Sequence, residues 1–396
     1  MNGVVIVGAS VAGVHAAEAL RDAGFDRPVT LLSAETDLPY DRPPLSKSAL
    51  RGEASKSQLL LRPEGWYQQH GIDLVLGRRA RQLDPQRKSV LLDSGAELGY
   101  DGLILATGAA ARSFEPVHGE SADVYRLRTA DDCARLRDRL VPGARVLVIG
   151  AGFLGLEVAA TAHEIGGEVS IVELGPAPLA MALGVDVGQW FKRLHESHGV
   201  AVHCDNSVTA IDVRRDRSRA YLRDGGVIDA DVVVAALGAV PMVQWLAGSG
   251  LELAGGGVRC DAYLRTSAAD VVAAGDIAYW DNELYGSYMR VEHWTNAVEQ
   301  GAFAARSLLG ANERPYVGPP YFWTDQFAAK TRTVGYLDGV DAISIQRQDD
   351  HSLVALYGRG DVLRAAVCVN APRSLLSCRR AITERAPWRA AIESLY

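Results

Sequence analysis

The residues most suggestive of chemistry are three glycines at the spacing of a phosphate-binding turn. An apolar run at residues 146–149 leads into this turn, and a helical stretch at residues 156–160 follows it. In such a turn the glycines allow a tight bend and close approach of the backbone to a pyrophosphate, which then lies at the helix N-terminus. The residues assigned to this site are Gly150, Gly152, Phe153, Leu154 and Gly155.

An acid follows this turn where an adenosine ribose would lie. The next apolar run, residues 169–172, ends at Glu173. A carboxylate there can accept hydrogen bonds from the ribose hydroxyls and repels a 2′-phosphate, and no arginine follows closely to hold one. The pattern therefore favours NADH over NADPH. The alternative is a tight strand-to-helix turn with no ligand.

A second, less complete turn opens the chain. Residues 4–7 are apolar, and Gly8, Ser10 and Gly13 follow, with Ala12 inside the turn. Ser10 replaces the middle glycine but is small enough to leave room for phosphates. A further apolar run, 29–32, leads to Glu35, our candidate for the ribose of this nucleotide. Two nucleotide units in one chain indicate a hydride relay from a nicotinamide to a bound flavin.

The elements that position these turns belong to an ordinary globular protein. The chain of 396 residues is long enough for two or three domains, with 48% hydrophobic and 22% charged residues. A net charge of −7 argues against a nucleic-acid partner. The apolar runs are too short to span a membrane, and no secretory signal is evident, so we expect a cytoplasmic protein.

The five cysteines have no spacing that suggests chemistry. None of them forms a C-x-x-C or C-x-x-x-x-C pair, so a sequence-local redox disulfide or metal knuckle is not expected. We predict that they are small buried hydrophobic residues, and we predict no metal site.

Several further phrases point to a family. Residues 39–47 read Pro-Tyr-Asp-Arg-Pro-Pro-Leu-Ser-Lys. Distinctive segments follow in order at residues 103–108, 232–238, 272–277, 292–300 and 322–326. Together they resemble the ferredoxin reductases of bacterial oxygenase and cytochrome P450 systems, the family of putidaredoxin reductase and of the biphenyl dioxygenase reductase component. The resemblance covers essentially the whole chain.

The resemblance implies an α/β fold that is glutathione-reductase-like, with two Rossmann-type dinucleotide-binding domains plus a C-terminal α+β domain. An FAD-binding domain would comprise residues 1–109 and 239–317, and an NADH-binding domain would comprise residues 110–238. The C-terminal domain would be residues 318–396. In it we predict strands at 333–337, 342–346, 353–357 and 362–369, then a helix at 374–385.

The resemblance also implies catalytic roles for Lys47, Glu157 and Trp294. The lysine would lie beside the hydride-accepting N5 of the flavin, and the glutamate would face it from the NADH-domain helix. Because burying either charge alone is costly, we expect the two to pair. No proton-abstracting base is needed, since hydride passes directly from NADH to the flavin by proximity and orientation. Trp294 and a helix beginning near Thr295 would cap the pyrimidine end of the flavin.

Other residues match cofactor-binding positions of the family. Asp276 would hydrogen-bond the ribityl chain of FAD, and the same residue could cap a following helix. Arg128 would contact FAD, and the backbone of Ala80 would meet its adenine. The remaining expected cofactor-binding residues are Arg42, Thr107, Gly108, Gly238, Gly275, Glu292 and His293.

A missing thiol indicates where the electrons go. Disulfide reductases of the related superfamily carry a cysteine pair beside the flavin, and NADH peroxidases carry one cysteine, but residues 40–47 contain none. The electrons would then leave singly to a small [2Fe-2S] ferredoxin that feeds a P450 or Rieske oxygenase. We expect a monomer or weak homodimer with no membrane or nucleic-acid partner. The alternatives are a rubredoxin reductase, an NADH oxidase, or a flavoprotein like apoptosis-inducing factor that senses NADH.

Overall fold

The computed structural model describes residues 3–115, 117–118, 124–214 and 217–394. The chain divides into two compact units. The first comprises Met1–Asp41, Lys56–Ala110 and Val240–Phe322. The second comprises Arg42–Ser55, Ala111–Ala239 and Trp323–Tyr396. The segment that carries Lys47 therefore belongs to the second unit, where Leu45 accepts a hydrogen bond from the thiol of Cys133 and Arg51 pairs with Glu164. The predicted domain boundaries stay a prediction.

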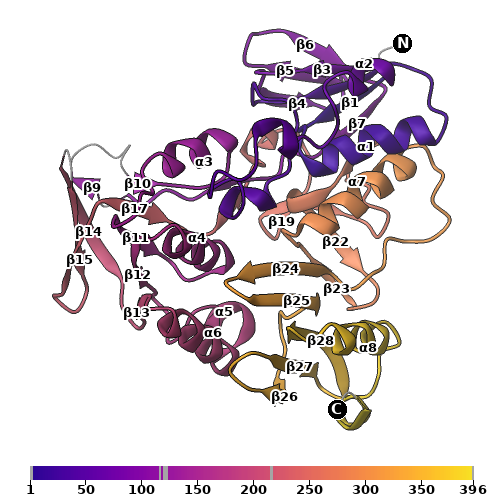
Figure 1. Ribbon diagram of the computed structural model, residues 1–396. Coiled ribbons are helices and arrows are strands. Elements are labelled where there is room, and N and C mark those ends of the chain that lie inside the picture. The colour runs from indigo at the N-terminus through magenta and orange to yellow at the C-terminus, as the bar shows by residue number, and fades with distance from the viewer. Residues whose placement is uncertain (1–2, 116, 119–123, 215–216, 395–396) are drawn as a thin grey trace. The chain divides into compact units, whose positions relative to one another are not determined.

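A five-stranded parallel sheet forms the core of the first unit. Its order is β21 (Val271–Ala273), β7 (Gly102–Leu105), β1 (Val4–Val7), β2 (Val29–Leu32) and β3 (Ile72–Val75). The strands β1 and β7 are buried throughout, as expected of parallel strands covered on both faces. Helices α1 (Val11–Asp22) and α7 (Trp294–Leu308) lie side by side (Figure 1). They approach closely because Gly301 has no side chain: a Cβ there would lie 2.2 Å from the carbonyl oxygen of Ala12.

Smaller elements complete the first unit. One antiparallel sheet contains β4 (Ala80–Asp84), β5 (Ser89–Leu92) and β6 (Glu97–Gly99). A mixed sheet contains β19 (Leu253–Ala254), β20 (Gly257–Cys260), β22 (Ala278–Asn282) and β23 (Ser287–Met289), of which β20 and β22 pair in parallel. The first unit also contains the short helix α2 (Trp66–Gln69) and the 3-10 turns η2 (Lys56–Leu59), η4 (Gln244–Leu246) and η5 (Gly275–Ile277).

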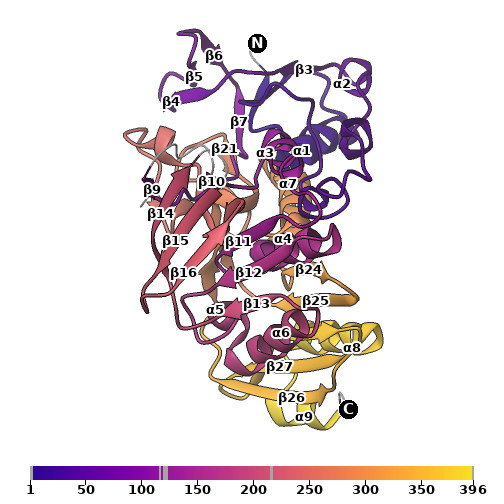
Figure 2. The same cartoon turned by 60° about the vertical axis from the view of Figure 1, so that its left-hand side comes forward.

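The second unit repeats the parallel arrangement. Its sheet runs β10 (Val124–Tyr125), β17 (Val232–Ala235), β11 (Arg145–Ile149), β12 (Glu168–Val172) and β13 (Ala201–His203). The helices connecting these strands are α3 (Ala130–Arg137), α4 (Phe153–Glu164), α5 (Ala180–Leu183) and α6 (Val185–Ser197), and the 3-10 turn η1 (Pro43–Ser46) belongs to the same unit. Figure 2 shows β14 (Val208–Arg214), β15 (Arg217–Leu222) and β16 (Val227–Ala230) as a separate sheet, which β9 (Val117–His118) extends. Strands β8 (Ala109–Ala111) and β18 (Ala239–Pro241) lie where the chain passes between units.

The C-terminal part of the second unit is a five-stranded antiparallel sheet with two helices. Its order is β24 (Tyr321–Gln326), β25 (Ala329–Gly335), β28 (Val362–Val369), β27 (Leu353–Arg359) and β26 (Ala342–Gln348). Helix α8 (Pro372–Thr383) packs on β25 and β28, and α9 (Trp388–Ser394) follows. The strand predicted at 362–369 is confirmed. The sequence reading missed β24 and α9, and it ended α8 too late, because Arg385 has a left-handed backbone (φ +54°) that a helix cannot include.

The cysteines are as expected with one exception. Four of them (Cys133, Cys260, Cys368 and Cys378) are buried, whereas Cys204 is half-buried. Within the described ranges, no helix is both long and apolar enough to cross a bilayer. The cytoplasmic location stays a prediction.

Candidate functional site

The first glycine-rich turn joins β1 to α1 in the first unit. Gly8 has φ +113°, and a Cβ there would lie 2.1 Å from the carbonyl oxygen of Ala106. A Cβ on Gly13 would lie only 1.8 Å from the carbonyl oxygen of Gly8. Both positions therefore exclude any side chain, and the helix is held close against the strand end.

The start of α1 is built to receive an anion. Ser10 is the residue before the first helical turn, but its side chain makes no capping hydrogen bond, and no acid lies in that turn. The N-terminus of α7 is likewise uncapped by its preceding residue, His293. Helix N-termini in this state attract negative charge such as phosphate or an electron-rich ring.

An unsatisfied buried nitrogen also fits a cofactor in this unit. Nδ1 of His293 is buried and has no hydrogen-bond partner among the described residues. Desolvation lowers the pKa of His293 to about 4, so the ring is neutral, and its Nδ1 remains available for a hydrogen bond to a cofactor. Together with the two glycine positions and the uncapped α1, this fits the FAD predicted at the first turn.

The other predicted FAD residues of this unit lie in varied settings. Glu35 follows β2 and accepts a hydrogen bond from the hydroxyl of Tyr40. Ala80 begins β4 at a register shift. Thr107 donates to the carbonyl of Met242 at 2.7 Å, and the carbonyl of Gly108 accepts from the backbone N–H of Met242 at 2.9 Å.

Gly275 and Asp276 form the 3-10 turn η5 after β21. Gly275 has φ +73° and donates its N–H to Oε1 of Gln300 at 2.9 Å. The suggestion that Asp276 caps a following helix is wrong, because strand β22 follows and Ala274 precedes the turn. Arg290 donates to the carbonyl of Asp276 at 2.9 Å and pairs with Glu292 at 2.5 Å, which braces this turn.

Trp294 begins α7, close to the predicted helix start. Its indole N–H donates to Oδ1 of Asp41 at 2.6 Å. Because this hydrogen bond uses the indole N–H, Trp294 would contact a flavin through the apolar part of its ring. The role predicted for this residue stays a prediction.

The second glycine-rich turn joins β11 to α4 in the second unit. Gly150 has φ +98°, and a Cβ on Gly155 would lie 2.1 Å from the carbonyl oxygen of Gly150. Gly152 differs, because its φ is −73° and a Cβ there would meet nothing within 4 Å. The first and third glycines are thus required by packing, while the middle one faces open space. The helix residues Phe153 and Leu154 follow directly, and Leu154 is exposed.

Glu173 is joined to the second turn. Its Oε2 accepts the backbone N–H of Ala151 at 2.6 Å, and its Oε1 accepts that of Gly175 at 2.8 Å. The carboxylate is half-exposed, and each of its oxygens retains a second lone pair. It can therefore receive a ribose hydroxyl while holding the turn, which fits the NADH predicted here.

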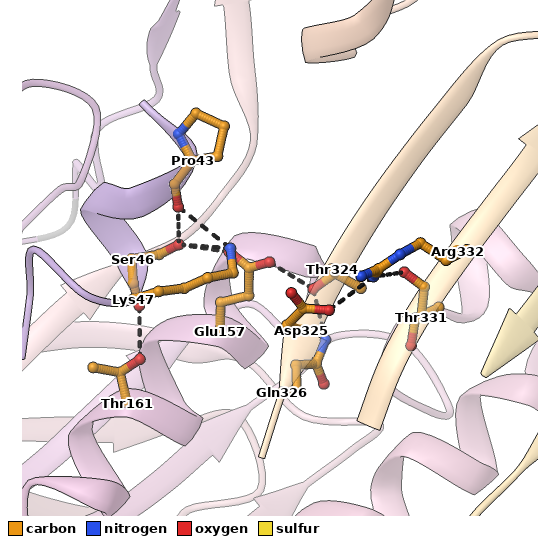
Figure 3. Close-up of polar contacts among 10 residues, drawn as sticks. All are labelled: Pro43, Ser46, Lys47, Glu157, Thr161, Thr324, Asp325, Gln326, Thr331 and Arg332. Carbon is orange, nitrogen blue, oxygen red and sulfur yellow. Dashed lines mark hydrogen bonds and ion pairs between the residues drawn. The ribbon is translucent and has the colours of Figure 1, made fainter. Parts of the chain in front are cut away.

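Lys47 and Glu157 meet in the second unit, as Figure 3 shows. Nζ of Lys47 lies 2.6 Å from Oε2 of Glu157, and the two side chains are only 19% and 9% exposed. The hydroxyl of Ser46 donates to the same Oε2 at 2.5 Å, and the hydroxyl of Thr324 donates to Oε1 at 2.6 Å. The expected pairing is confirmed, and the carboxylate has three donors that compensate its burial.

The remaining predicted cofactor-binding residues of this unit form hydrogen bonds within it. Nη1 of Arg42 donates to the carbonyl of Arg128 at 2.5 Å, which brings two predicted FAD contacts together. Gly238 has φ +84°, and its carbonyl accepts from the N–H of Arg112 at 3.0 Å.

Sequence reasoning missed two residues at the Lys47–Glu157 pair and one contact to the segment that carries Lys47. Ser46 and Thr324 donate to the carboxylate, although both lie inside phrases that we used only for recognition. Cys133 is buried as predicted, and its thiol also donates to the carbonyl of Leu45 at 3.3 Å. Alternation of buried positions in β24 could have identified Thr324, whereas nothing in the sequence places α3 beside residue 45.

Comparisons with known proteins agree with this geometry. Residues 2–301 match the pyridine nucleotide-disulphide oxidoreductase family, and residues 321–393 match the reductase C-terminal family. The ferredoxin–NAD(+) reductase component of the anthranilate 1,2-dioxygenase system from Burkholderia cepacia is 36% identical, over 96% of this chain and 93% of that protein. A rubredoxin–NAD(+) reductase from Pseudomonas putida is 34% identical, over 93% of this chain and 96% of that protein.

A solved structure is similar over nearly the whole length. It is the putidaredoxin reductase chain of a covalent putidaredoxin reductase–putidaredoxin complex, with a TM-score of 0.93 and 31% sequence identity. The match covers 98% of this chain and 94% of that one.

Proposed function

We infer the function of this chain from its family: it belongs to the pyridine nucleotide-disulphide oxidoreductase family, with a reductase C-terminal domain. It is an FAD-dependent NADH:ferredoxin oxidoreductase. Bound FAD supplies the conversion of a two-electron hydride into single electrons. The chain itself binds, orients and shields the two nucleotides.

The residues assigned to each cofactor follow from the two units. The Gly8 turn, the N-terminus of α1 and His293 would hold FAD, and the Gly150 turn with Glu173 would hold NADH. We propose that Lys47 stabilises negative charge on the reduced flavin. Glu157 would fix the position of the Lys47 ammonium, because the pair is mostly buried.

The observation that carries the choice of acceptor is the absence of a reactive thiol at residues 40–47. Cys133 is the one thiol bonded to this segment within the described ranges, and it is buried. Burial raises the pKa of Cys133, so it stays a protonated thiol that donates to a carbonyl. A two-electron transfer to a cysteine is therefore not supported, and a one-electron protein acceptor is favoured.

We propose that the acceptor is a small [2Fe-2S] ferredoxin that feeds a P450 or Rieske oxygenase. The relatives of this chain include reductase components of oxygenase systems, and one of its structural matches is a complex that contains putidaredoxin. A weak, transient complex is expected, with the chain otherwise a monomer or weak homodimer.

The test is a steady-state assay with NADH and three acceptors. We expect rapid reduction of a [2Fe-2S] ferredoxin, slower reduction of rubredoxin, and little turnover with dioxygen. Rubredoxin is one of the three acceptors because one relative of this chain is a rubredoxin–NAD(+) reductase. Fast turnover with dioxygen alone would overturn the proposal in favour of an NADH oxidase.

A further inference from the structure

The Glu157 carboxylate stands at the end of a buried hydrogen-bond chain. Thr324 donates to Oε1 of Glu157 at 2.6 Å, and Nε2 of Gln326 donates to the hydroxyl of Thr324 at 3.3 Å. Oε1 of Gln326 lies 3.0 Å from Nε2 of His195 on α6. These three side chains are 1%, 1% and 0% exposed. A buried polar chain of this length that begins at a predicted catalytic pair indicates a function for its members.

Strand geometry explains how one short segment supplies two of the links. Residues two apart in a strand share a face, so Thr324 and Gln326 of β24 both point toward the Glu157 side (Figure 3). Asp325 between them points away and pairs with Arg332 at 2.8 Å. The start of the reductase C-terminal domain thus contributes directly to the Lys47–Glu157 pair.

In this hydrogen-bond chain, donors and acceptors follow one another in a single direction. Because Nε2 of Gln326 donates to Thr324, its Oε1 must accept from His195, which requires the proton of that imidazole on Nε2. Burial lowers the pKa of His195 to about 4, and the nearby His163 and His198 act in the same direction, so the ring is neutral. Its Nδ1 is buried without a hydrogen-bond partner among the described residues. Every donor in the chain therefore points toward Glu157.

We propose that Thr324, Gln326 and His195 are positioning residues that fix the Glu157 carboxylate, and through it the Lys47 ammonium, for reduction of the flavin by NADH. The inference rests on the function proposed above. Without the hydroxyl of Thr324, Oε1 of Glu157 would lose this hydrogen-bond donor and the carboxylate would turn more freely about its last torsion. The other contacts of Nζ of Lys47 are long, at 3.3 Å to the Pro43 carbonyl and 3.4 Å to Ser46, so the ammonium depends on Glu157 for its position.

The experiment compares Thr324→Val with Thr324→Ser in the FAD-loaded enzyme. Valine keeps the volume and removes the hydroxyl, and serine restores it. The matched control is Thr333→Val in β25, because Thr333 is equally buried and its hydroxyl has no hydrogen-bond partner among the described residues. Anaerobic stopped-flow mixing with NADH, without any ferredoxin, gives the flavin reduction rate and the Kd for NADH.

We expect Thr324→Val to slow reduction about tenfold, the size associated with one hydrogen bond to a charged group, with the Kd changed less than about twofold. Thr324→Ser should recover most of the rate, and Thr333→Val should match the wild type. A Thr324→Val enzyme indistinguishable from Thr333→Val would overturn the inference.

A second measurement does not depend on turnover. In the ¹⁵N-histidine-labelled holoenzyme at neutral pH, we expect the His195 imidazole to be neutral with its proton on Nε2. The His195→Gln variant, which keeps a donor, should reduce its flavin faster than His195→Phe, which keeps only the ring. A proton on Nδ1, or equal rates in the two variants, would contradict the inference. If NADH fails to reduce the flavin of the wild type, the proposed function is wrong. If the wild type and Thr324→Val reduce their flavins equally fast, only the positioning role of Thr324, Gln326 and His195 is wrong.

Discussion

The carboxylate of Glu173 accepts the backbone N–H of Ala151, at 2.6 Å, inside the second glycine-rich turn. Its other oxygen accepts the N–H of Gly175 at 2.8 Å. The residue that we assign to the adenosine ribose therefore also holds the turn that would bind the pyrophosphate. Substitutions at this position will change both the recognition of the nucleotide and the stability of the turn.

Glu173→Ala combined with Leu174→Arg should shift coenzyme preference toward NADPH. The change removes a carboxylate that repels a 2′-phosphate, and Leu174 is 66% exposed, so an arginine there can reach the phosphate. We expect the ratio of kcat/KM for NADH to that for NADPH to fall about a hundredfold, as expected for roughly two charge-assisted contacts.

Single variants separate the two roles of Glu173. Glu173→Ala alone should lower the free energy of unfolding by about 1–2 kcal/mol, because two backbone N–H groups lose their acceptor. Leu174→Arg alone should leave stability near the wild-type value. Unchanged selectivity in the double variant would show that Glu173 does not meet the ribose.

The glycines of the second turn should respond differently to alanine. Gly155→Ala places a Cβ 2.1 Å from the carbonyl oxygen of Gly150, so we expect a loss of about 2 kcal/mol or more in stability. Gly152→Ala meets nothing within 4 Å at an ordinary φ, so it should fold normally. Its methyl group would occupy space that the pyrophosphate needs, and the Kd for NADH should rise about tenfold or more.

Thermal unfolding and NADH titration of the two variants provide the measurement. Normal NADH affinity in a stable Gly152→Ala protein would contradict placement of the pyrophosphate at this turn.

The sequence allowed prediction of whatever depends on local pattern. Both turns, the acid after each second strand, and the strand at 362–369 follow from apolar runs and glycine spacing, which are local properties. The 3-10 turn at Asp276 was misread, since the same Gly-Asp pair can precede a helix or a strand.

Contacts between distant segments were accessible only where a family pattern supplied them. The Lys47–Glu157 pair was expected in this way, whereas His195 and Cys133 carry no local signal. Their significance depends on which helix packs against residues 42–55 and 323–327, and that is decided by tertiary packing.

Lys47→Met should slow flavin reduction more than it weakens NADH binding. The substitution keeps an unbranched side chain but removes the ammonium that lies 2.6 Å from Glu157. Stopped-flow reduction should slow about tenfold or more, while the Kd for NADH changes only about twofold. A normal reduction rate would count against the proposed role of this lysine.

The same pair makes a prediction about stability. Lys47→Met leaves the carboxylate of Glu157, 9% exposed, without its cation, and we expect the free energy of unfolding to fall by about 2–3 kcal/mol. Adding Glu157→Gln removes the unpaired charge and should restore most of that loss. Urea unfolding of the single and double variants tests this. Additive losses would mean that the two side chains are not energetically coupled.

Cys133→Ala should leave electron transfer intact. The thiol is buried, and burial raises its pKa, so it is a hydrogen-bond donor to the Leu45 carbonyl and a poor nucleophile. We expect ferredoxin reduction within about twofold of the wild type, because one weak hydrogen bond is lost. Loss of most activity, with the protein still folded, would indicate that electrons pass through a thiol and would favour a different acceptor.

Two histidines, His195 and His293, should make the protein less stable in mild acid. Burial lowers the pKa values of His195 and His293 from 6.5 to about 4, so between these values the unfolded chain binds protons that the native chain does not. The free energy of unfolding should therefore be at its full value above pH 6.5 and decline as the pH falls toward 4, by up to about 1.4 kcal/mol per pH unit for each histidine.

His195→Gln removes one titrating group but keeps a donor for Gln326, and should make the decline shallower. Urea unfolding from about pH 7 to about pH 5 gives the slopes, and an equal decline in His195→Gln and the wild type would mean that His195 already titrates normally in the fold.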